Sequence, residues 1–347
     1  MASMSILREI PRRALVSSSG LAAVEASMMR LAIGDQRDMA GSMVTESLVA
    51  GGKRLRARLA LAAGEALGLQ REALIPWAAA CELLHNATLI HDDIQDGDQL
   101  RRGHATTWAR YGVGQAINAG DLALMLPFLA ISELNSAPAV KMRLHEAIAK
   151  AAARTARGQA EEMFLPQKEG VSWEDWVWAA EGKSGALLGL PVQGAALLAN
   201  LDVRAAETLG RIFAKAGVLY QLQDDLLDLS NHKGKARRAS DIQEGKVNAL
   251  IVAHLSLYPE QTAETLAFLQ SPTRRTDAVE VDAFVNRLWM EGAVAYVQEQ
   301  LAIWAHAVLQ DPLLCSIPAL SAVANELVER VVQSAQTVSM NLQENAV

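Results

Sequence analysis

Apolar residues recur at helical spacing along almost the whole chain, and the alternating pattern typical of strands is nearly absent. Segments 77–93 and 212–229 are apolar nearly all round, which is typical of central helices in a large bundle. Only short polar breaks separate the helical segments. The pattern predicts helices near 21–48, 53–67, 72–95, 107–134, 139–165, 173–199, 203–230, 243–256, 261–269, 279–309 and 317–340.

Composition supports the same fold class. Hydrophobic residues make up 51% of the 347 residues and aromatic residues only 5%, and the abundance of Ala and Leu favours helix throughout. A chain of this length can form one large domain or two ordinary ones. Because no long Pro-, Gly- or Ser-rich linker divides it, we expect an all-α fold with a flexible tail at 1–20 and a single domain over 21–347.

Charge and hydropathy exclude several functional classes. A net charge of -7 argues against a nucleic-acid-binding protein. The chain has no run of eighteen apolar residues, its N-terminus lacks the apolar core of a secretory signal, and its two cysteines lack metal-ligand spacing. These features predict a cytoplasmic protein without stable membrane insertion. Arg and Ser near the N-terminus leave an organellar transit peptide as the alternative.

Two matching aspartate clusters lie at the ends of apolar helical segments, in "HDDIQD" and "LQDDLLD". Their members are Asp92, Asp93 and Asp96, and Asp224, Asp225 and Asp228. In each cluster the first residue is four positions before one partner on the same helix face. Carboxylates this close repel one another and need a cation, and an all-oxygen ligand set without His or Cys favours Mg²⁺. A single cluster would be better explained as a solvated acidic helix end.

Basic residues accompany both clusters. Arg101 and Arg102 follow the first, Lys235 and Lys246 follow the second, and "GGKRLR" at 51–56 predicts another basic helix start. Guanidinium and ammonium groups beside metal-binding carboxylates are typical of a polyphosphate site. The chain therefore has the residues to hold two phosphorylated groups.

From about residue 25 onward, the chain resembles the trans-type isoprenyl diphosphate synthases, or polyprenyl synthetases. The resemblance rests on ordered motifs, namely "GGKRLR" at 51–56, "LLHNATLIHDDIQDGDQLRRG" at 83–103, "GQ" at 158–159, "KSGAL" at 183–187, "YQLQDDLLD" at 220–228, "GK" at 234–235 and "SDIQEGK" at 240–246. It implies an all-α bundle around a deep central cavity, in a homodimer, with the two Asp motifs facing each other across the cavity mouth.

The resemblance also implies a reaction and its residues. The reaction joins isopentenyl diphosphate to an allylic diphosphate (dimethylallyl, geranyl or farnesyl) and releases pyrophosphate. The six aspartates are expected to bind three Mg²⁺ ions, directly or through water, which draw off the allylic leaving group. The allylic diphosphate would be held by Arg101, Lys183, Lys235 and Lys246. The isopentenyl diphosphate would be held by Lys53, Arg56, His85 and Arg102, and the carbocation would be stabilised near Ser184 and Gln221.

Product length is expected to depend on the helix before the first Asp cluster. Ala87 stands where short-chain members of the family carry an aromatic residue that stops growth at C15, and Ala is too small to block a tunnel. Leu84, one turn further, or Phe128 is the expected floor. These positions favour a C20 product, with C25 or longer as the alternative.

Some positions depart from the family pattern. Ala57 replaces a Pro, Ala239 a Gly and Asn248 a Thr, around the basic helix start and the second Asp motif.

Two other functions stay open. A class I terpene cyclase would carry an Asn/Ser/Glu triad in place of the second Asp cluster, and a non-catalytic modulatory subunit would have lost Asp or Lys residues that this chain keeps.

Overall fold

The protein is described by a computed structural model over residues 20–34, 38–229 and 239–345. Within these ranges the only strands are two strands of two residues each, which form one hairpin, so the prediction of an all-α fold is confirmed. The expected tail at 1–20 lies outside the described residues except for Gly20.

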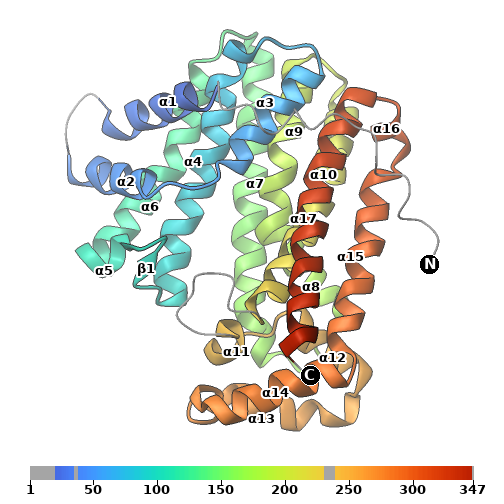
Figure 1. The fold of residues 1–347 in the computed structure, drawn as a ribbon. Helices are drawn as coiled ribbons and strands as arrows, with labels where there is room; N and C mark the ends of the chain where they lie inside the picture. The colour runs from blue at the N-terminus through green and yellow to red at the C-terminus, as the bar shows by residue number, and fades with distance from the viewer. Residues whose placement is uncertain (1–19, 35–37, 230–238, 346–347) are drawn as a thin grey trace. The chain divides into compact units, whose positions relative to one another are not determined.

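The helices and strands are α1 Leu21–Ile33, α2 Met39–Val49, α3 Leu55–Ala66, α4 Arg71–Asp96, β1 Leu100–Arg101, β2 His104–Ala105, α5 Thr107–Tyr111, α6 Val113–Ser132, α7 Pro138–Phe164, α8 Trp173–Ala180, α9 Ala186–Leu198, α10 Val203–Asp228, α11 Ser240–Glu244, α12 Ala249–Leu257, α13 Thr262–Gln270, α14 Ala278–Met290, α15 Ala293–Leu309, α16 Pro312–Cys315 and α17 Pro318–Asn345 (Figure 1).

Most predicted helices are present, but several are broken. The predicted helix 107–134 is divided into α5 and α6 at Gly112 (φ 83°), and 279–309 is divided into α14 and α15 at Gly292 (φ 86°). Glycine adopts this left-handed backbone without steric cost, so it ends a helix that the apolar pattern alone would continue. The predicted helix 21–48 is likewise two helices, and 243–256 consists of the end of α11 and most of α12.

The contacts divide the chain into two compact units. Unit 1 comprises Met1–Ala152, Leu187–Arg211 and Ser316–Val323, and unit 2 comprises Ala153–Ala186, Ile212–Cys315 and Ala324–Val347. The expectation of a single domain over 21–347 stays a prediction.

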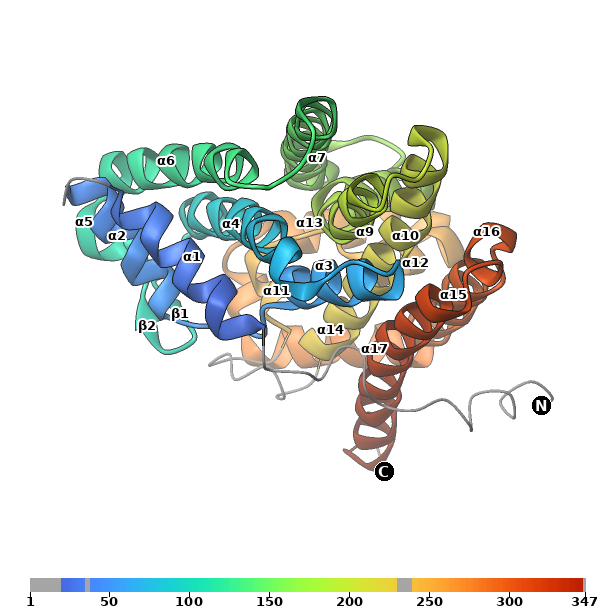
Figure 2. The same ribbon diagram turned by 90° about the horizontal axis from the view of Figure 1, so that it is seen from above.

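In unit 1, α4 is the central helix. It packs against α6, α3 and α1, and Figure 2 shows α4 between α6 and α1. The indole Nε1 of Trp77, which is fully buried, donates to the carbonyl of Pro191 at 2.9 Å. Gly194 has no side chain to collide with this ring, so α9 approaches α4 closely. The first Asp cluster therefore ends a helix that is fixed along its length.

In unit 2, α12 is the most apolar helix. Every residue from Ala249 to Leu255 is buried, and the helix packs against α15, α8 and α14. Phe268 of α13 stacks on Phe284 of α14 with ring centroids 4.6 Å apart. The side-chain oxygen of Asn248 accepts the Ile251 N–H at 3.2 Å, so the Asn that stands where the family has Thr caps α12.

Among the described residues, two helices, α4 and α6, are long and apolar enough to cross a membrane by length and composition. Within the protein, 67% of the apolar window of α4 is buried, as expected of a core helix, against 44% of the window of α6.

Candidate functional site

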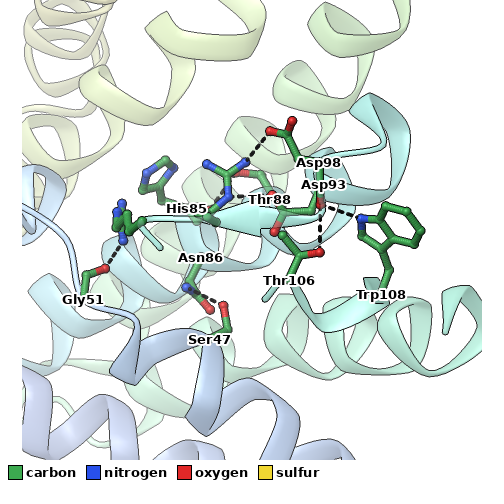
Figure 3. Close-up of polar contacts among 11 residues, drawn as sticks. Ser47, Gly51, His85, Asn86, Thr88, Asp93, Asp98, Thr106 and Trp108 are labelled. Carbon is green, nitrogen blue, oxygen red and sulfur yellow. Dashed lines mark hydrogen bonds and ion pairs between the residues drawn. The ribbon is translucent and has the colours of Figure 1, made fainter. Parts of the chain in front are cut away.

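The last turn of α4 places the first Asp cluster, and its middle residue has a structural partner. Asp93 is 5% exposed and accepts a hydrogen bond from Arg101 Nε at 2.5 Å (Figure 3). Burial raises the pKa of Asp93 to about 6, and the Arg101 guanidinium opposes this rise. Asp92 and Asp96, four residues apart on one helix face, are both partly exposed. Asp92 and Asp96 are therefore better placed than Asp93 to meet a ligand.

The hairpin after α4 orients the two arginines. Thr106 Oγ1 and Trp108 Nε1 both donate to the carbonyl of Asp98 at 2.8 Å and tie the hairpin to the end of α4 (Figure 3). Arg101 reaches Asp93, whereas Arg102, at the tip with φ 54°, donates to the carbonyl of Gly51. Gly52 has a φ of 146°, a backbone conformation that favours glycine, and a Cβ there would lie 2.7 Å from Arg102 Nη1. The hairpin was not predicted from the sequence.

The basic residues at the start of α3 differ in their contacts and in their exposure to solvent. Arg54 is 7% exposed and donates to the carbonyl of Leu48 at 2.7 Å and to Glu25 at 2.9 Å, so it is part of the scaffold. Lys53 is exposed, and Arg56 is partly exposed. The buried Glu82 of α4 accepts the Ala57 N–H at 3.1 Å, and this bond uses one of the N–H groups in the first turn of α3 that have no partner within the helix.

His85 lies among these arginines. Burial, followed by the charges of Arg56, Arg102 and Arg101, lowers the pKa of His85 well below its usual value, so the imidazole is neutral at neutral pH. Its Nδ1 is enclosed and has no hydrogen-bond partner among the described residues. Positive charge here therefore comes from guanidinium groups, while His85 offers a neutral donor or acceptor.

A pocket of about 300 Å³ lies beside this cluster within unit 1. Its walls come from the C-terminal half of α2, from α4, from the hairpin and from α5, and they include Asp93, Arg101 and Arg102. Asn86 in its wall is 4% exposed and donates to Ser47 Oγ at 3.2 Å (Figure 3). The arginines that follow the first Asp cluster therefore border a pocket lined by both polar and apolar side chains.

In unit 2, a π-helical turn at Glu181–Gly185 carries Lys183 and Ser184. The Lys183 ammonium forms an ion pair with Glu162 of α7. Ser184 Oγ donates to Gln221 Oε1 at 3.0 Å, and Gln221 Nε2 donates to Asp225 Oδ1 at 2.9 Å. The structure thus brings Ser184, Gln221 and the second Asp cluster into one hydrogen-bonded chain. Glu162 was not recognised from the sequence, because a glutamate in an exposed-looking "AEEM" segment gives no signal.

Two members of the second Asp cluster are enclosed. Asp225 is 1% exposed and also accepts the Ala249 N–H at 2.8 Å; burial, with the charges of Asp241 and Asp224, raises the pKa of Asp225 well above its usual value. Asp228 is 3% exposed and accepts hydrogen bonds from Ser240 Oγ and, at 2.9 Å, from the Asp241 N–H. Asp224 is exposed. The enclosed pair holds α11 and α12 against α10, and Asp224 is the member that meets solvent.

Lys235 and Lys246 are the predicted basic residues that follow the second Asp cluster. Lys246 Nζ pairs with Glu244 at 2.8 Å and its side chain is 30% exposed. Lys235 lies outside the described residues. Ala239, which stands where the family has Gly, adopts a left-handed backbone (φ 55°) and donates its N–H to the carbonyl of Asp228 at 2.8 Å. Backbone strain makes an alanine in this conformation less stable than a glycine by about 1 kcal/mol.

The donor set fits a divalent, oxygen-binding metal. Among the described residues, no three His, Cys, Asp or Glu side chains are grouped closely enough to form a metal site alone. Mg²⁺ is commonly held by one or two carboxylates, with water and substrate phosphates completing its shell. Burial raises the pKa of Asp93 and of Asp225, and a cation bound nearby would favour the charged form of each carboxyl. The partly exposed Asp92 and Asp96 and the exposed Asp224 suit this role.

The expected product-length residues are packed positions. Ala87 and Leu84 are both 0% exposed within α4. Phe128, the other expected floor residue, lies against His145 with ring centroids 5.7 Å apart. A growing chain would have to displace neighbours to reach these positions, so their role in product length stays a prediction.

Comparison with known proteins gives a consistent result. The family model described as "Polyprenyl synthetase" matches residues 38–287. A geranylgeranyl pyrophosphate synthase of Geoglobus acetivorans is 32% identical over 73% of this chain and 77% of its own, and a farnesyl diphosphate synthase of Geobacillus stearothermophilus is 33% identical over 75% and 86%. The structure of a Caulobacter crescentus polyprenyl synthase complexed with calcium and isoprenyl diphosphate superposes with a TM-score of 0.77 at 25% identity, covering 92% of this chain and 99% of that one. With its two Asp clusters at the ends of core helices, the chain belongs to the polyprenyl synthetase family.

Proposed function

We propose that this chain condenses isopentenyl diphosphate head to tail with an allylic diphosphate (dimethylallyl, geranyl or farnesyl) and forms a longer trans-prenyl diphosphate, with C20 favoured. The observation that carries the proposal is the pair of Asp clusters, each with partly or fully exposed carboxylates beside enclosed ones that fix the helix ends. The relatives named for geranylgeranyl and farnesyl diphosphate synthesis support a prenyltransferase that elongates chains.

The side chains have separate tasks in this reaction. We assign Asp92, Asp96 and Asp224 to metal, and Asp93, Asp225 and Asp228 to the scaffold that holds them. Bound Mg²⁺, for which we propose three ions, would neutralise charge that grows on the departing diphosphate. Arg101, Lys183, Lys246 and Lys235 would stabilise the same charge as donors. Proton loss from the new chain needs no side-chain base, because the released pyrophosphate can accept the proton.

Near the π turn, Ser184 and Gln221 would stabilise the carbocation that the allylic substrate forms. The Gln221 carbonyl oxygen accepts from Ser184 while its amide donates to Asp225, which fixes the direction of the amide dipole. Oxygen atoms with a fixed orientation stabilise a carbocation without forming a bond to it. The isopentenyl diphosphate would be bound without metal. Its ligands would be Arg56, Arg102, the neutral His85 and the exposed Lys53.

The test is chromatography of prenyl products. Purified enzyme with Mg²⁺, isopentenyl diphosphate and each allylic primer in turn should form all-trans products ending mainly at C20. Formation of a cyclic hydrocarbon would favour the terpene cyclase, and absence of product with every primer would favour a modulatory subunit.

Product length is testable at α4. Ala87→Phe should shorten the main product towards C15, because an aromatic ring would fill the path of the growing chain, and Leu84→Ala should lengthen it by about one isoprene unit, since one helical turn is about 5.4 Å. Both sites are fully buried, so Leu83→Ala, which removes a similar volume from the same helix, is the control for general loosening. Unchanged products from an active Ala87→Phe enzyme would show that the chain does not pass Ala87.

We further propose a homodimer formed through α6. One face of this helix exposes apolar side chains, with Val113 at 48%, Ile117 at 45%, Met125 at 55% and Leu129 at 53%, and the exposed Asp121 lies between Ile117 and Met125 on the same face. Several apolar side chains exposed together on one helix face are typical of a subunit interface. Ile117→Glu with Met125→Glu should convert the dimer to a monomer in sedimentation measurements; a wild-type monomer at micromolar concentration would contradict the proposal.

A further inference from the structure

Glu162 of α7 lies beside the lysine that we assign to the allylic diphosphate. The Glu162 carboxylate pairs with Lys183 Nζ, and each side chain is 20% exposed. This partial burial strengthens the attraction compared with an ion pair in open solvent. An ammonium group carries three N–H donors, so pairing with Glu162 does not by itself prevent contact with a phosphate oxygen.

The same face of α7 also fixes the backbone of Lys183. Gly158 precedes Glu162 by four residues and therefore lies on the same face of the helix. A Cβ on Gly158 would collide with the Lys183 backbone nitrogen and would lie 2.7 Å from the carbonyl oxygen of Ala179. Gly158 thus lets α7 touch the π turn, and Glu162 reaches the end of the Lys183 side chain from one turn further along.

The opposite side of the turn is fixed by α10. A Cβ on Gly217 would lie 2.7 Å from the carbonyl carbon of Ser184, and the Ser184 hydroxyl donates to Gln221 one turn later. Lys183 therefore has a backbone held between two helices, while its four-carbon side chain has Glu162 as an anchor. A π turn, which adds a residue to the helix, often occurs where a functional side chain must be aimed.

We infer that Glu162 is a positioning residue, which holds the Lys183 ammonium in the place where it meets the diphosphate of the allylic substrate. The inference rests on the proposed function, because it takes Lys183 as a ligand of that diphosphate. Lysine is a point charge on a flexible stem, so without an anchor its ammonium samples many positions. Glu162 reduces this sampling before the substrate arrives.

The neighbouring Glu161 provides a matched control. It lies on the same helix, but its carboxylate pairs with Lys168 at 3.3 Å, and Lys168 also pairs with Asp175 at 2.7 Å. Glu161→Gln therefore removes one negative charge and one ion pair from α7 without touching the π turn. Comparing Glu161→Gln with Glu162→Gln separates loss of helix charge from loss of the Lys183 anchor.

The experiment is a double-mutant cycle in steady-state kinetics. Glu162→Gln should lower kcat/KM for the allylic diphosphate about tenfold and leave KM for isopentenyl diphosphate unchanged. Glu162→Asp, whose carboxylate is one methylene further away, should recover part of the loss. Combined with Lys183→Ala, Glu162→Gln should add almost nothing, whereas Glu161→Gln should be silent alone and in combination.

Three results would count against the inference. They are independent, multiplicative effects of Glu162→Gln and Lys183→Ala, an equal rise in KM for both substrates, and an effect of Glu161→Gln as large as that of Glu162→Gln. If Glu162→Gln does not fold, the same cycle with Glu162→Asp decides the question. A wild-type enzyme that elongates no primer would overturn the proposed function instead, so the two failures are distinguishable.

Discussion

Replacing Asp92 or Asp224 by asparagine should lower kcat by about 10²-fold or more. Each change keeps the side-chain volume but removes a carboxylate that we assign to metal, partly exposed at Asp92 and exposed at Asp224. The free energy of unfolding should change little, because neither residue is enclosed as Asp93 and Asp225 are. Steady-state turnover at saturating Mg²⁺, measured beside urea unfolding, checks both parts of the expectation.

The control for this prediction is Asp282→Asn, at an exposed aspartate of α14, which should leave turnover unchanged. Near-wild-type turnover in either Asp92→Asn or Asp224→Asn would overturn the metal assignment. If Asp92→Asn alone were inactive, the second cluster would not serve the leaving group, and the terpene cyclase, with its single Asp-rich motif, would become the better explanation.

Arg101→Met should destabilise the fold by about 3 kcal/mol at pH 8, because it leaves the enclosed Asp93 carboxylate without its cation. Burial already raises the pKa of Asp93 to about 6, and loss of Arg101 would raise it further. A folded-state pKa above the unfolded value favours the folded state as pH falls through it. The destabilisation should therefore shrink between pH 8 and pH 6, as urea unfolding at the two pH values would show.

Two further variants make this prediction specific. Asp93→Asn in the Arg101→Met background should restore most of the stability at pH 8, since it removes the unpaired charge. Arg102→Met, which breaks a contact with the carbonyl of Gly51, should cost less and show no such pH dependence. Equal costs for the two arginines at both pH values would contradict the separate roles assigned to them.

The helical fold was predictable because its apolar periodicity is strong, but the breaks were not. Gly112 and Gly292 end helices through their backbone conformation, and a single glycine inside an apolar pattern does not distinguish a break from a tolerated residue. The hairpin at 100–105 has too few residues to show any periodicity, and the contacts that fix it are made by Thr106 and Trp108 to a backbone carbonyl.

The sequence predicted which residues belong to the candidate site, but it did not predict the separate role of each residue. Spacing identified both Asp clusters, but only burial separates Asp93, Asp225 and Asp228 from the members that face solvent. Arg54 of the basic motif at 51–56 is a scaffold residue, because its side chain donates to the Leu48 carbonyl and to Glu25, and the motif alone does not reveal these contacts.

The departures from the family pattern have local physical consequences. Ala57 supplies an N–H to Glu82 that a proline does not have, and Asn248 caps α12. Ala239 adopts a left-handed backbone, which a glycine would adopt without steric cost. These departures therefore alter local contacts and backbone strain, and they remove none of the residues assigned to metal or diphosphate.

The most direct test of the central claim is pyrophosphate release from an allylic diphosphate, measured with and without isopentenyl diphosphate in the presence of Mg²⁺. Chain elongation predicts rapid release only when both substrates are present, with one pyrophosphate formed for each isopentenyl unit added to the product. Rapid release from the allylic diphosphate alone would show ionisation without condensation and would contradict the account.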